Sequence, residues 1–429
     1  MKDTVGIILA AGEGTRMNST LPKVLHKLCG KPMLQYLLDI LGQLGIKKNV
    51  VVVGHQAQEV RQILKNRDIK IVRQAKLLGS ADAVWQTHSF LARFKGNLLI
   101  VYGDTPLISY QSLEKLIRAH EQTQAACTLL SAVLKNPSGY GRIVRSEDNR
   151  VLKIVEEQDA DNYEKAIAEI NVGAYCFRAK ELFSALKEIK PNNVKKEYYL
   201  TTAIELLNKR KAKVEAILTA DEQEAQGVNS RQDLAFANTV INKRNIEKLL
   251  SQGVTIVDPA NTYIYGDVQV GQDTVIYPQS VIEGQVKIGR ACQIGPFAHL
   301  RSGTILADHV AIGNFVEVVR SSVGCGSKIK HHAYIGDTII GQAVNVGAGT
   351  IVANYDGKSK SKTLIADGAF IGTGSILIAP VKIGKKAITG AGSVITKNKN
   401  VPAGATVIGV PAKILKKRNS KRKIQNAKL

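Results

Sequence analysis

The sequence of 429 residues predicts an α/β protein in two parts: an N-terminal Rossmann-like domain with a mostly parallel sheet, followed by a C-terminal left-handed parallel β-helix of hexapeptide repeats. Before residue 230, apolar runs rich in β-branched residues alternate with amphipathic segments, which is typical of a parallel sheet covered by helices on both faces. After residue 250, branched aliphatic residues recur at every sixth position, which is typical of a β-helix. We expect domains at 1–229 and 251–429, joined by a linker helix at 230–250.

The N-terminal part offers three candidate features at predicted strand ends. They are the loop at Gly12, Gln74 after "IVR" and Asp104 after "LLIVYG". Ligands of a parallel sheet bind beyond the carboxyl ends of its strands, so we expect these features to converge on one site. The strands are predicted at residues 5–11, 49–54, 70–74 and 97–104, and the helices at 32–46, 58–66 and 80–94.

The stretch "ILAAGEGTRMNSTLPK", residues 8–23, has the composition of a phosphate-binding loop. Met17 stands where a P-loop and a dinucleotide fingerprint each require a further glycine, so both motifs are excluded. A GxG alone fits a tight turn between a strand and a helix equally well. Arg16 and Lys23 follow closely, and two cations beside backbone N–H groups suit a triphosphate.

The six-residue period begins after a segment, 230–250, that contains no Gly or Pro and is predicted to be one long helix. The frame shifts by one residue before Val323 and again before Ile340, and the polar segment 345–363 is expected to be a loop. One open alternative is that such a stack has a structural role alone and carries no active site. Repeats of this kind also favour trimers. The first run of the period comprises Ile264, Val270, Ile276, Ile282, Ile288, Ile294, Leu300, Leu306, Ile312 and Val318.

The net charge of +23 raises the alternative of a nucleic-acid-binding protein. Part of this charge lies in the C-terminal tail "KILKKRNSKRKIQNAKL", which has no acidic residue. A solvated tail is the simpler interpretation, because no nucleic-acid motif accompanies it, and the excess also suits anionic small substrates. Five scattered cysteines favour a reducing compartment, and no apolar run is long enough for a membrane span, so we expect a cytoplasmic protein with no membrane insertion.

Several motifs together resemble one family. In order they are "LAAGEGTRM", "LPKVLHKLCGKPM", "VYGDTPLI", "GYGRIV", "IVEE", "EINVGAYCF", "GVNSR", "HHAYIGD" and "NVGAGTIVANYDGKSKSKT". From about residue 4 to about residue 400 the chain is similar to the GlmU family of bifunctional N-acetylglucosamine-1-phosphate uridylyltransferases and glucosamine-1-phosphate N-acetyltransferases.

The resemblance implies two reactions that supply a bacterial cell-wall precursor. Acetyl-CoA acetylates glucosamine 1-phosphate, and UTP then converts N-acetylglucosamine 1-phosphate to UDP-N-acetylglucosamine with release of pyrophosphate. It also implies a homotrimer. The alternative within the same class is a sugar-1-phosphate nucleotidyltransferase with one activity, in which the β-helix only assembles the subunits.

The uridylyl site implied by the resemblance includes one Mg²⁺. A sugar 1-phosphate is already an anion, so its attack on a triphosphate needs positioning and charge neutralisation rather than a general base. Asp104 suits magnesium, although by itself it also fits a helix or turn cap, and the resemblance adds Asn229 as the second ligand. Arg16 and Lys23 are the implied catalytic cations. The implied UTP and UDP-N-acetylglucosamine contacts are Leu9, Ala10, Ala11, Gly12, Lys23, Gln74, Gly79, Ser80, Tyr102, Gly103, Asp104, Gly141, Glu156, Asn171 and Asn229.

The acetyl site must remove a proton from a sugar ammonium, and histidine is the suitable base. Strand spacing does not decide between His331 and His332, but the resemblance selects His331, with Glu317 to orient it. Three positions depart from the family pattern: Val319 replaces a lysine, Thr373 a serine and Gly409 an arginine. The implied acceptor contacts are Arg301, Tyr334, Asn345 and Lys360, the last from a neighbouring subunit, and the implied acetyl-CoA contacts are Ala348, Asn354, Tyr355, Thr373 and Ala391.

Overall fold

The computed structural model describes residues 3–65, 67–219 and 221–415. The chain divides into two compact units, 1–240 and 241–429, and the division falls within helix α9 (Arg231–Ser251), which is the long helix predicted at 230–250. The basic tail beyond residue 415 lies outside the described residues.

The N-terminal unit is built on a sheet whose main order is β11-β7-β10-β6-β1-β4-β5. Neighbouring strands are parallel except around β10, which runs antiparallel to both β6 and β7. The mostly parallel sheet predicted from the sequence is therefore present. Its strands are β1 (Thr4–Ala10), β4 (Lys48–Val53), β5 (Ile69–Arg73), β6 (Asn97–Tyr102), β7 (Cys127–Val133), β8 (Arg142–Arg145), β9 (Val151–Val155), β10 (Glu169–Arg178) and β11 (Val214–Leu218), while β2 (Lys27–Leu28) and β3 (Lys31–Pro32) form a separate pair.

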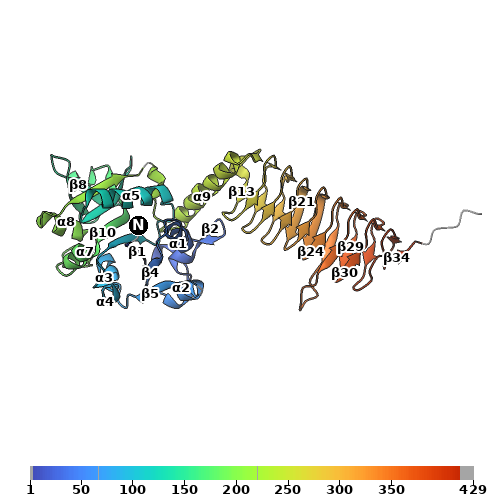
Figure 1. The fold of residues 1–429 in the computed structure, drawn as a ribbon, viewed down its shortest axis with the longest axis horizontal. Coiled ribbons are helices and arrows are strands. Elements are labelled where there is room, and N and C mark those ends of the chain that lie inside the picture. The colour runs from blue at the N-terminus through green and yellow to red at the C-terminus, as the bar shows by residue number, and fades with distance from the viewer. Residues whose placement is uncertain (1–2, 66, 220, 416–429) are drawn as a thin grey trace, which may run out of the picture. The chain divides into compact units, whose positions relative to one another are not determined.

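Apolar cores cover both faces of this sheet. Along β4, Val50 and Val52 belong to one buried cluster, whereas Val51 and Val53 belong to the other. Alternate side chains of a strand point to opposite faces, so a run of valines is what a strand buried on both sides requires. The covering helices are α1 (Met33–Gln43), α2 (Ala57–Leu64), α3 (Ser80–Trp85), α4 (His88–Leu91), α5 (Tyr110–Thr123), α6 (Asn162–Lys165), α7 (Ala179–Leu186) and α8 (Thr202–Lys209), with short 3₁₀ turns η1 (Thr15–Met17), η2 (Lys23–Leu25) and η3 (Glu222–Ala225) (Figure 1).

The single helix predicted at 80–94 is wrong, because the structure has two short helices there, α3 and α4. The break falls at Thr87, which is fully buried and donates its hydroxyl to the Val84 carbonyl oxygen at 2.7 Å. A threonine that bonds to a preceding carbonyl competes with the helical ladder, and this explains the interruption.

The C-terminal unit is the predicted β-helix, in which the coils follow one another from β13 to β34 (Figure 1). The strand partners Val275, Gln293 and Ala311 are eighteen residues apart, which is three hexapeptides per coil. The next partners, Lys328 and Asn345, follow at intervals of seventeen, and these two shorter coils account for the frame shifts.

The strands of the C-terminal unit form two sheets, and a 3₁₀ turn, η4 (Pro259–Asn261), lies between the first two strands. One sheet comprises β12 (Thr255–Ile256), β13 (Tyr263–Ile264), β15 (Val275–Ile276), β16 (Val281–Ile282), β18 (Gln293–Ile294), β19 (His299–Leu300), β21 (Ala311–Val319), β23 (Lys328–Gly336), β25 (Asn345–Val346), β26 (Ile351–Ala353), β28 (Phe370–Ile371), β29 (Ile376–Ile378), β31 (Ile388–Thr389), β32 (Val394–Ile395), β33 (Thr406–Ile408) and β34 (Lys413–Ile414). The other comprises β14 (Gln269–Val270), β17 (Lys287–Ile288), β20 (Ile305–Leu306), β22 (Ser322–Val323), β24 (Thr338–Ile340), β27 (Thr363–Ile365) and β30 (Val381–Ile383).

The aliphatic residues of the six-residue period fill the interior of the coils. Of the ten residues in the first run, nine are buried and Val270 is partly buried against the same core. The last half of α9 adds Ile246 and Leu249 to this core. Asn242 on the same helix accepts the Ile264 N–H and donates to the Thr262 carbonyl oxygen, both at 2.8 Å, so the helix satisfies backbone groups of the first coils.

The loop predicted at 345–363 is shorter than expected. Val346 and Val352 are buried and continue the inward period in β25 and β26, so the excursion is confined to residues between β26 and β27. Asn345 pairs with Phe370, twenty-five positions later, and the insertion therefore lengthens one coil without breaking the stack.

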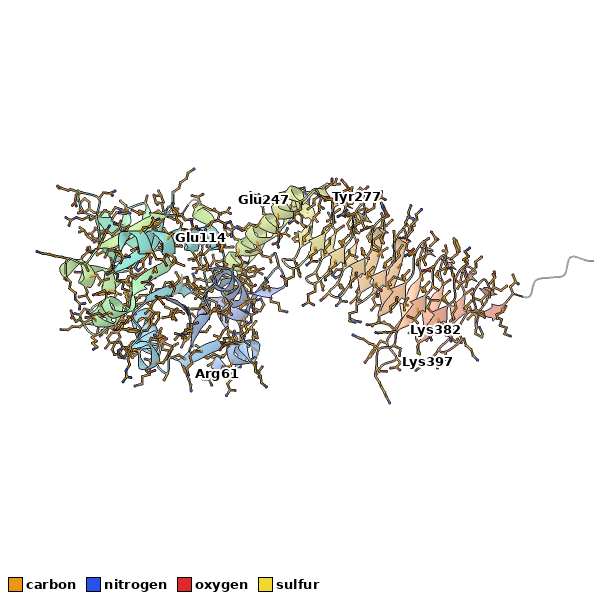
Figure 2. The ribbon with its side chains drawn as sticks, in the orientation of Figure 1. Arg61, Glu114, Glu247, Tyr277, Lys382 and Lys397 are labelled. Carbon is orange, nitrogen blue, oxygen red and sulfur yellow. The ribbon has the colours of Figure 1, made fainter. Side chains whose placement is uncertain are left out.

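Positive charge continues from the tail into the last coils. After Asp367 the described chain has six lysines and no acidic residue. Figure 2 labels two of them, Lys382 and Lys397. All six are exposed, and they are Lys382, Lys385, Lys386, Lys397, Lys399 and Lys413.

No helix among the described residues is long and apolar enough to cross a membrane.

Candidate active sites

The glycine loop follows the end of β1 and closes back on the start of η2. Gly14 has a φ of 65°, and a Cβ there would lie 2.8 Å from the Lys23 Cβ, so the Lys23 stem passes over a position that needs glycine. A Cβ at Gly12 would meet nothing within 4 Å, which leaves the loop open to a ligand. Gly103 donates its N–H to the Leu9 carbonyl oxygen at 2.8 Å and thereby ties the loop to the end of β6.

Two adjoining pockets at this edge of the sheet collect most of the predicted uridylyl-site residues. The first has a volume of about 340 Å³ and the second about 700 Å³, and Gly12, Ser80, Tyr102 and Asp104 line both. Gly103 lines neither and lies beneath them. The first pocket also contains Leu9, Ala10, Ala11, Lys23, Gln74 and Gly79, and the second contains Arg16, Gly141, Glu156, Asn171 and Asn229.

In the first pocket, Gln74 is 3% exposed, and its amide nitrogen donates to the Gly79 carbonyl oxygen at 3.0 Å and to Asp82 Oδ2 at 2.8 Å. Gly79 has a φ of 117°, and a Cβ there would lie 2.5 Å from the Tyr198 carbonyl oxygen, so the turn requires glycine. Ser80 Oγ accepts the Leu200 N–H at 2.9 Å. These contacts fix polar groups along the pocket at the start of α3.

In the second pocket, the Glu156 carboxylate accepts the Thr201 hydroxyl at 3.0 Å, and burial raises the pKa of Glu156. Asn171 donates its side-chain amide to the Tyr175 hydroxyl at 2.6 Å, and its backbone N–H to the Gly141 carbonyl oxygen at 2.9 Å. Polar groups held this firmly can recognise the hydroxyl and amide groups of a sugar.

Asp104 and Asn229 converge on a single cation. Lys23 Nζ donates to Asp104 Oδ2 and to Asn229 Oδ1, the latter at 3.1 Å. The Val228 N–H donates to the Asp104 carbonyl oxygen at 2.8 Å, and the Asn229 N–H donates to Asp233 Oδ2 at 3.0 Å, so the backbone at both positions is anchored independently of Lys23. A carboxylate and an amide oxygen aimed at one point fit Mg²⁺, whose remaining ligands are commonly phosphate oxygens and water.

The two neighbouring histidines of β23 have different surroundings. His331 is exposed and lies opposite Asn314 in the strand register. His332 has a φ of 41°, and its ring centroid lies 4.9 Å from that of Phe315, which in turn stacks on Phe297 at 5.0 Å. Both histidines are exposed, but the ring of His332 belongs to an aromatic stack, whereas the ring of His331 has no ring contact among the described residues.

Glu317 lies next to Tyr334 in the register of β21 and β23. Its carboxylate accepts a hydrogen bond from Arg301 Nη1 at 2.8 Å, and this ion pair raises the pKa of Arg301. The structure thus joins two predicted residues, Glu317 and Arg301. The contact expected between Glu317 and His331 is not among the hydrogen bonds of the described residues.

Three predicted acetyl-CoA contacts stack at one corner of successive coils. The Gly374 N–H donates to the Ala348 carbonyl oxygen at 2.7 Å, and the Gly392 N–H donates to the Thr373 carbonyl oxygen at 2.7 Å. Ala391 precedes Gly392 and takes the equivalent place on the third coil. Small residues repeated at this corner leave room for a long thin ligand along the stack.

Asn354 is held by a network that the sequence did not indicate. Its amide donates to Asp337 Oδ2, and Arg320 binds the same carboxylate through Nε at 2.7 Å and Nη2 at 2.8 Å. Arg320 lowers the pKa of Asp337. Val319 is 3% exposed, and the neighbouring Arg320 is bound to Asp337, so Arg320 does not stand in for the missing lysine in this arrangement.

The remaining predicted acceptor and acetyl-CoA residues are distributed along the unit. Tyr355 and Lys360 face each other across the loop after β26, and both are exposed. Asn345 begins β25, and Gly409 follows β33 with a φ of 96°. Lys360 also lies close enough to the Asp337 carboxylate, which Asn354 contacts, to contribute to the lowered pKa of Asp337.

Three family models match the chain: the MobA-like NTP transferase domain at residues 6–193, the GMPPB C-terminal domain at 264–356 and the bacterial transferase hexapeptide model, six repeats, at 362–397. Relatives named "Bifunctional protein GlmU" share 43% identity in Shouchella clausii, 45% in Carboxydothermus hydrogenoformans and 45% in Geobacillus sp.. The matches cover 95%, 94% and 94% of this chain and 96%, 97% and 94% of those proteins. The chain belongs to the GlmU family.

Membership of the GlmU family confirms the predicted resemblance, the predicted fold class and the pair of transferase activities. Among solved structures, a putative glucose-1-phosphate thymidylyltransferase from Bacillus anthracis is similar at 19% identity and a TM-score of 0.46, over 55% of this chain and 94% of that chain.

Sequence reasoning missed the residues that hold the predicted ones in place. Residue type and spacing do not specify these side-chain contacts, even where the partners are close in the chain or, as with Tyr175 and Asp337, lie within a quoted motif, so only the fold reveals them. They are Asp82 beside Gln74, Thr201 beside Glu156, Tyr175 beside Asn171, Asp233 beside Asn229, and Asp337 beside Asn354.

Proposed function

We propose that each unit carries one active site of an enzyme that makes UDP-N-acetylglucosamine, with uridylyl transfer in the N-terminal unit and acetyl transfer in the C-terminal unit. The observation that carries the proposal is the convergence of Asp104 and Asn229 on one cation, where the two adjoining pockets meet. A nucleotide in the smaller pocket and a sugar phosphate in the larger one would place their reacting phosphates at this boundary.

For uridylyl transfer, the glycine loop would bind the triphosphate through its backbone N–H groups, and Arg16 and Lys23 would neutralise its charge. Mg²⁺ held by Asp104 and Asn229 would supply charge stabilisation for the leaving pyrophosphate. The sugar phosphate oxygen attacks the α-phosphorus as the bond to pyrophosphate breaks, and no proton has to move. Glu156 and Asn171 would orient the sugar so that its phosphate is in line.

For acetyl transfer, His331 would remove the proton from the sugar ammonium, which frees the amine to attack the thioester carbonyl. As the carbon–sulfur bond breaks, the attacking nitrogen loses a second proton and the CoA sulfur takes one up, so the products are the amide and the CoA thiol. Arg301 would bind the sugar phosphate. Because Arg301 is paired with Glu317, binding of that phosphate to Arg301 would release the Glu317 carboxylate to orient His331.

The acetyl site would be completed by a second copy of the chain. We propose a homotrimer in which the exposed Lys360 reaches the acceptor site of a neighbouring subunit, and Asn354, Tyr355 and the corner at Thr373 receive acetyl-CoA. The five cysteines are free, four of them buried, which supports a reducing compartment, and we propose the cytoplasm.

Two assays on one preparation test the function. The first follows acetyl-CoA consumption with glucosamine 1-phosphate, and the second follows pyrophosphate release with UTP and N-acetylglucosamine 1-phosphate. We expect both to proceed, and the second to require Mg²⁺. Pyrophosphate release without acetyl-CoA consumption would support the alternative of a single-activity enzyme with a scaffold β-helix.

A further inference from the structure

The ammonium of Lys23 stands at the point on which the two proposed metal ligands converge. It binds a carboxylate oxygen of Asp104 and the amide oxygen of Asn229, two residues that are 81 and 206 positions away in the chain. The Lys23 side chain is 12% exposed and that of Asp104 is 25% exposed, so this ion pair is largely shielded from water.

The backbone around Lys23 directs its side chain to this point. Lys23 opens η2 directly after Pro22, whose φ of −49° fixes the approach of the chain. The stem then passes Gly14, where any side chain would collide with it. The backbone at Asp104 and Asn229 is fixed by contacts that do not involve Lys23: the Val228 N–H donates to the Asp104 carbonyl oxygen, and the Asn229 N–H donates to the Asp233 carboxylate. Both side chains therefore start from anchored backbone positions, and the same pair of side-chain oxygens is available to another cation when the ammonium leaves.

We propose that Lys23 is an internal counter-ion that occupies the metal position in the nucleotide-free enzyme and moves to the triphosphate when nucleotide binds, so that metal and lysine alternate between the same two oxygens. This inference rests on the proposed uridylyl site. An ammonium and a divalent cation repel each other and compete for the same lone pairs, so they cannot share this position. The triphosphate offers Lys23 a new anionic partner a short distance away, because Lys23 and the loop residues line the same pocket.

This exchange makes the metal and the nucleotide bind cooperatively. Without nucleotide, a metal ion must displace a charge-assisted pair of hydrogen bonds before it can bind. With nucleotide, the displacement has already occurred and phosphate oxygens join the ligands. By linkage, each ligand then raises the affinity for the other by the same factor. The site would consequently admit metal only together with the substrate that needs it.

The experiment measures Mn²⁺ binding to the full-length, nucleotide-free protein by electron paramagnetic resonance, with Mn²⁺ alone as the probe. We expect Lys23→Met to bind Mn²⁺ at least about tenfold more tightly than the wild type, since it removes the competing charge-assisted hydrogen bonds. Lys31→Met is the matched control, because it removes one positive charge and breaks a Lys–Asp pair, to Asp39, elsewhere in the same unit. We expect this control to match the wild type. The double variant Lys23→Met/Asp104→Asn should lose the gain.

Unchanged Mn²⁺ affinity in Lys23→Met would overturn the exchange. If Lys23→Met fails to fold, as judged by its melting curve, Lys23→Gln keeps most of the stem beside Gly14 and replaces it in the same measurement. The proposed function has a separate test, because Asp104→Asn should abolish metal-dependent uridylyl transfer whatever Lys23 does. Suppose that Asp104→Asn loses uridylyl transfer but both Lys23 variants bind Mn²⁺ as the wild type does. This outcome would reject the proposed role of Lys23 as a counter-ion and would leave the proposed metal site at Asp104 and Asn229 intact.

Discussion

The two units place their predicted site residues in different ways. In the N-terminal unit, residues from many separate segments line two adjoining pockets within one chain. In the C-terminal unit, several predicted residues, His331, Tyr355, Lys360 and Thr373, are exposed on the coils, whereas Asn354 is buried. A parallel sheet gathers the loops that follow its strands at one edge, whereas a β-helix repeats the same corner from coil to coil. One architecture thus builds a cavity, and the other builds a surface that a neighbouring chain can close.

The strongest test of this separation is Asp104→Asn, which removes the only carboxylate among the two proposed metal ligands. We expect uridylyl transfer, measured by pyrophosphate release, to fall by about two to four orders of magnitude, because transition-state charge is no longer stabilised. Acetyl transfer in the same preparation should persist. Equal loss of both activities would contradict independent sites.

The next largest effect is expected from His331→Ala in the other unit. Loss of the proposed general base should lower acetyl transfer by about a hundredfold, measured as acetyl-CoA consumption, while pyrophosphate release stays near normal. His332→Ala is the matched control, since His332 stacks on Phe315, and it should cost far less activity. If His332→Ala abolished acetylation and His331→Ala did not, the assignment of the base would be off by one residue.

A smaller, structural effect should appear when Ser80 is changed to Ala. The Leu200 N–H, on a fully buried residue, would lose its acceptor, which costs about 1–3 kcal/mol. We expect the melting transition of the N-terminal unit to fall by roughly 2–12 °C in calorimetry, at about 2–4 °C per kcal/mol for a unit of this size. Ser80→Thr keeps the hydroxyl and should melt close to the wild type. The temperature at which acetyl transfer is lost should be the same in the wild type, Ser80→Ala and Ser80→Thr. A lower inactivation temperature of acetyl transfer in Ser80→Ala would show that the two units unfold together.

The smallest effect concerns the network beside Asn354. Arg320 lowers the pKa of Asp337, so the pair stabilises the fold above the ordinary aspartate pKa of about 3.9, and this contribution disappears as the pH falls through the lowered value. Arg320 is 39% exposed, and solvent screening limits the contribution to less than about 1 kcal/mol. We expect Arg320→Ala to melt about 1–3 °C below the wild type at pH 7, with the difference narrowing towards pH 3.

The same variant tests whether this network positions Asn354 for acetyl-CoA. Arg320→Ala should raise the KM for acetyl-CoA several-fold with little change in kcat, because Asp337 would hold the Asn354 amide less firmly. Arg320→Lys keeps the charge but loses the paired N–H donors, and it should show an intermediate KM. An unchanged KM would mean that Asn354 does not need Asp337.

Much of the fold was predictable because its signals are periodic and local. The spacing of Ile264, Val270 and Ile276 predicted the coil, and the two frame shifts matched the two seventeen-residue coils. The prediction was less accurate in two places. The helix predicted at 80–94 is interrupted because the Thr87 hydroxyl bonds to a preceding carbonyl oxygen between α3 and α4. The loop predicted at 345–363 is shorter because the buried residues Val346 and Val352 continue the period through this polar segment. The proposed metal ligand Asn229 and the proposed acetyl-site residues rested on resemblance, since no spacing connects them.

The sequence by itself determined which backbone conformations were possible. Alternating apolar runs specify strands buried on both faces, a six-residue period specifies coils, and a glycine at position 14 permits the turn, because each of these depends on neighbouring residues in the chain. Only the tertiary structure decided which distant side chains meet. It brought Lys23 between Asp104 and Asn229, paired Glu317 with Arg301, and separated His331 from the aromatic stack of His332. Such contacts depend on how separate strands and coils are brought together, and that arrangement is encoded in the packing of the whole chain rather than in any local motif.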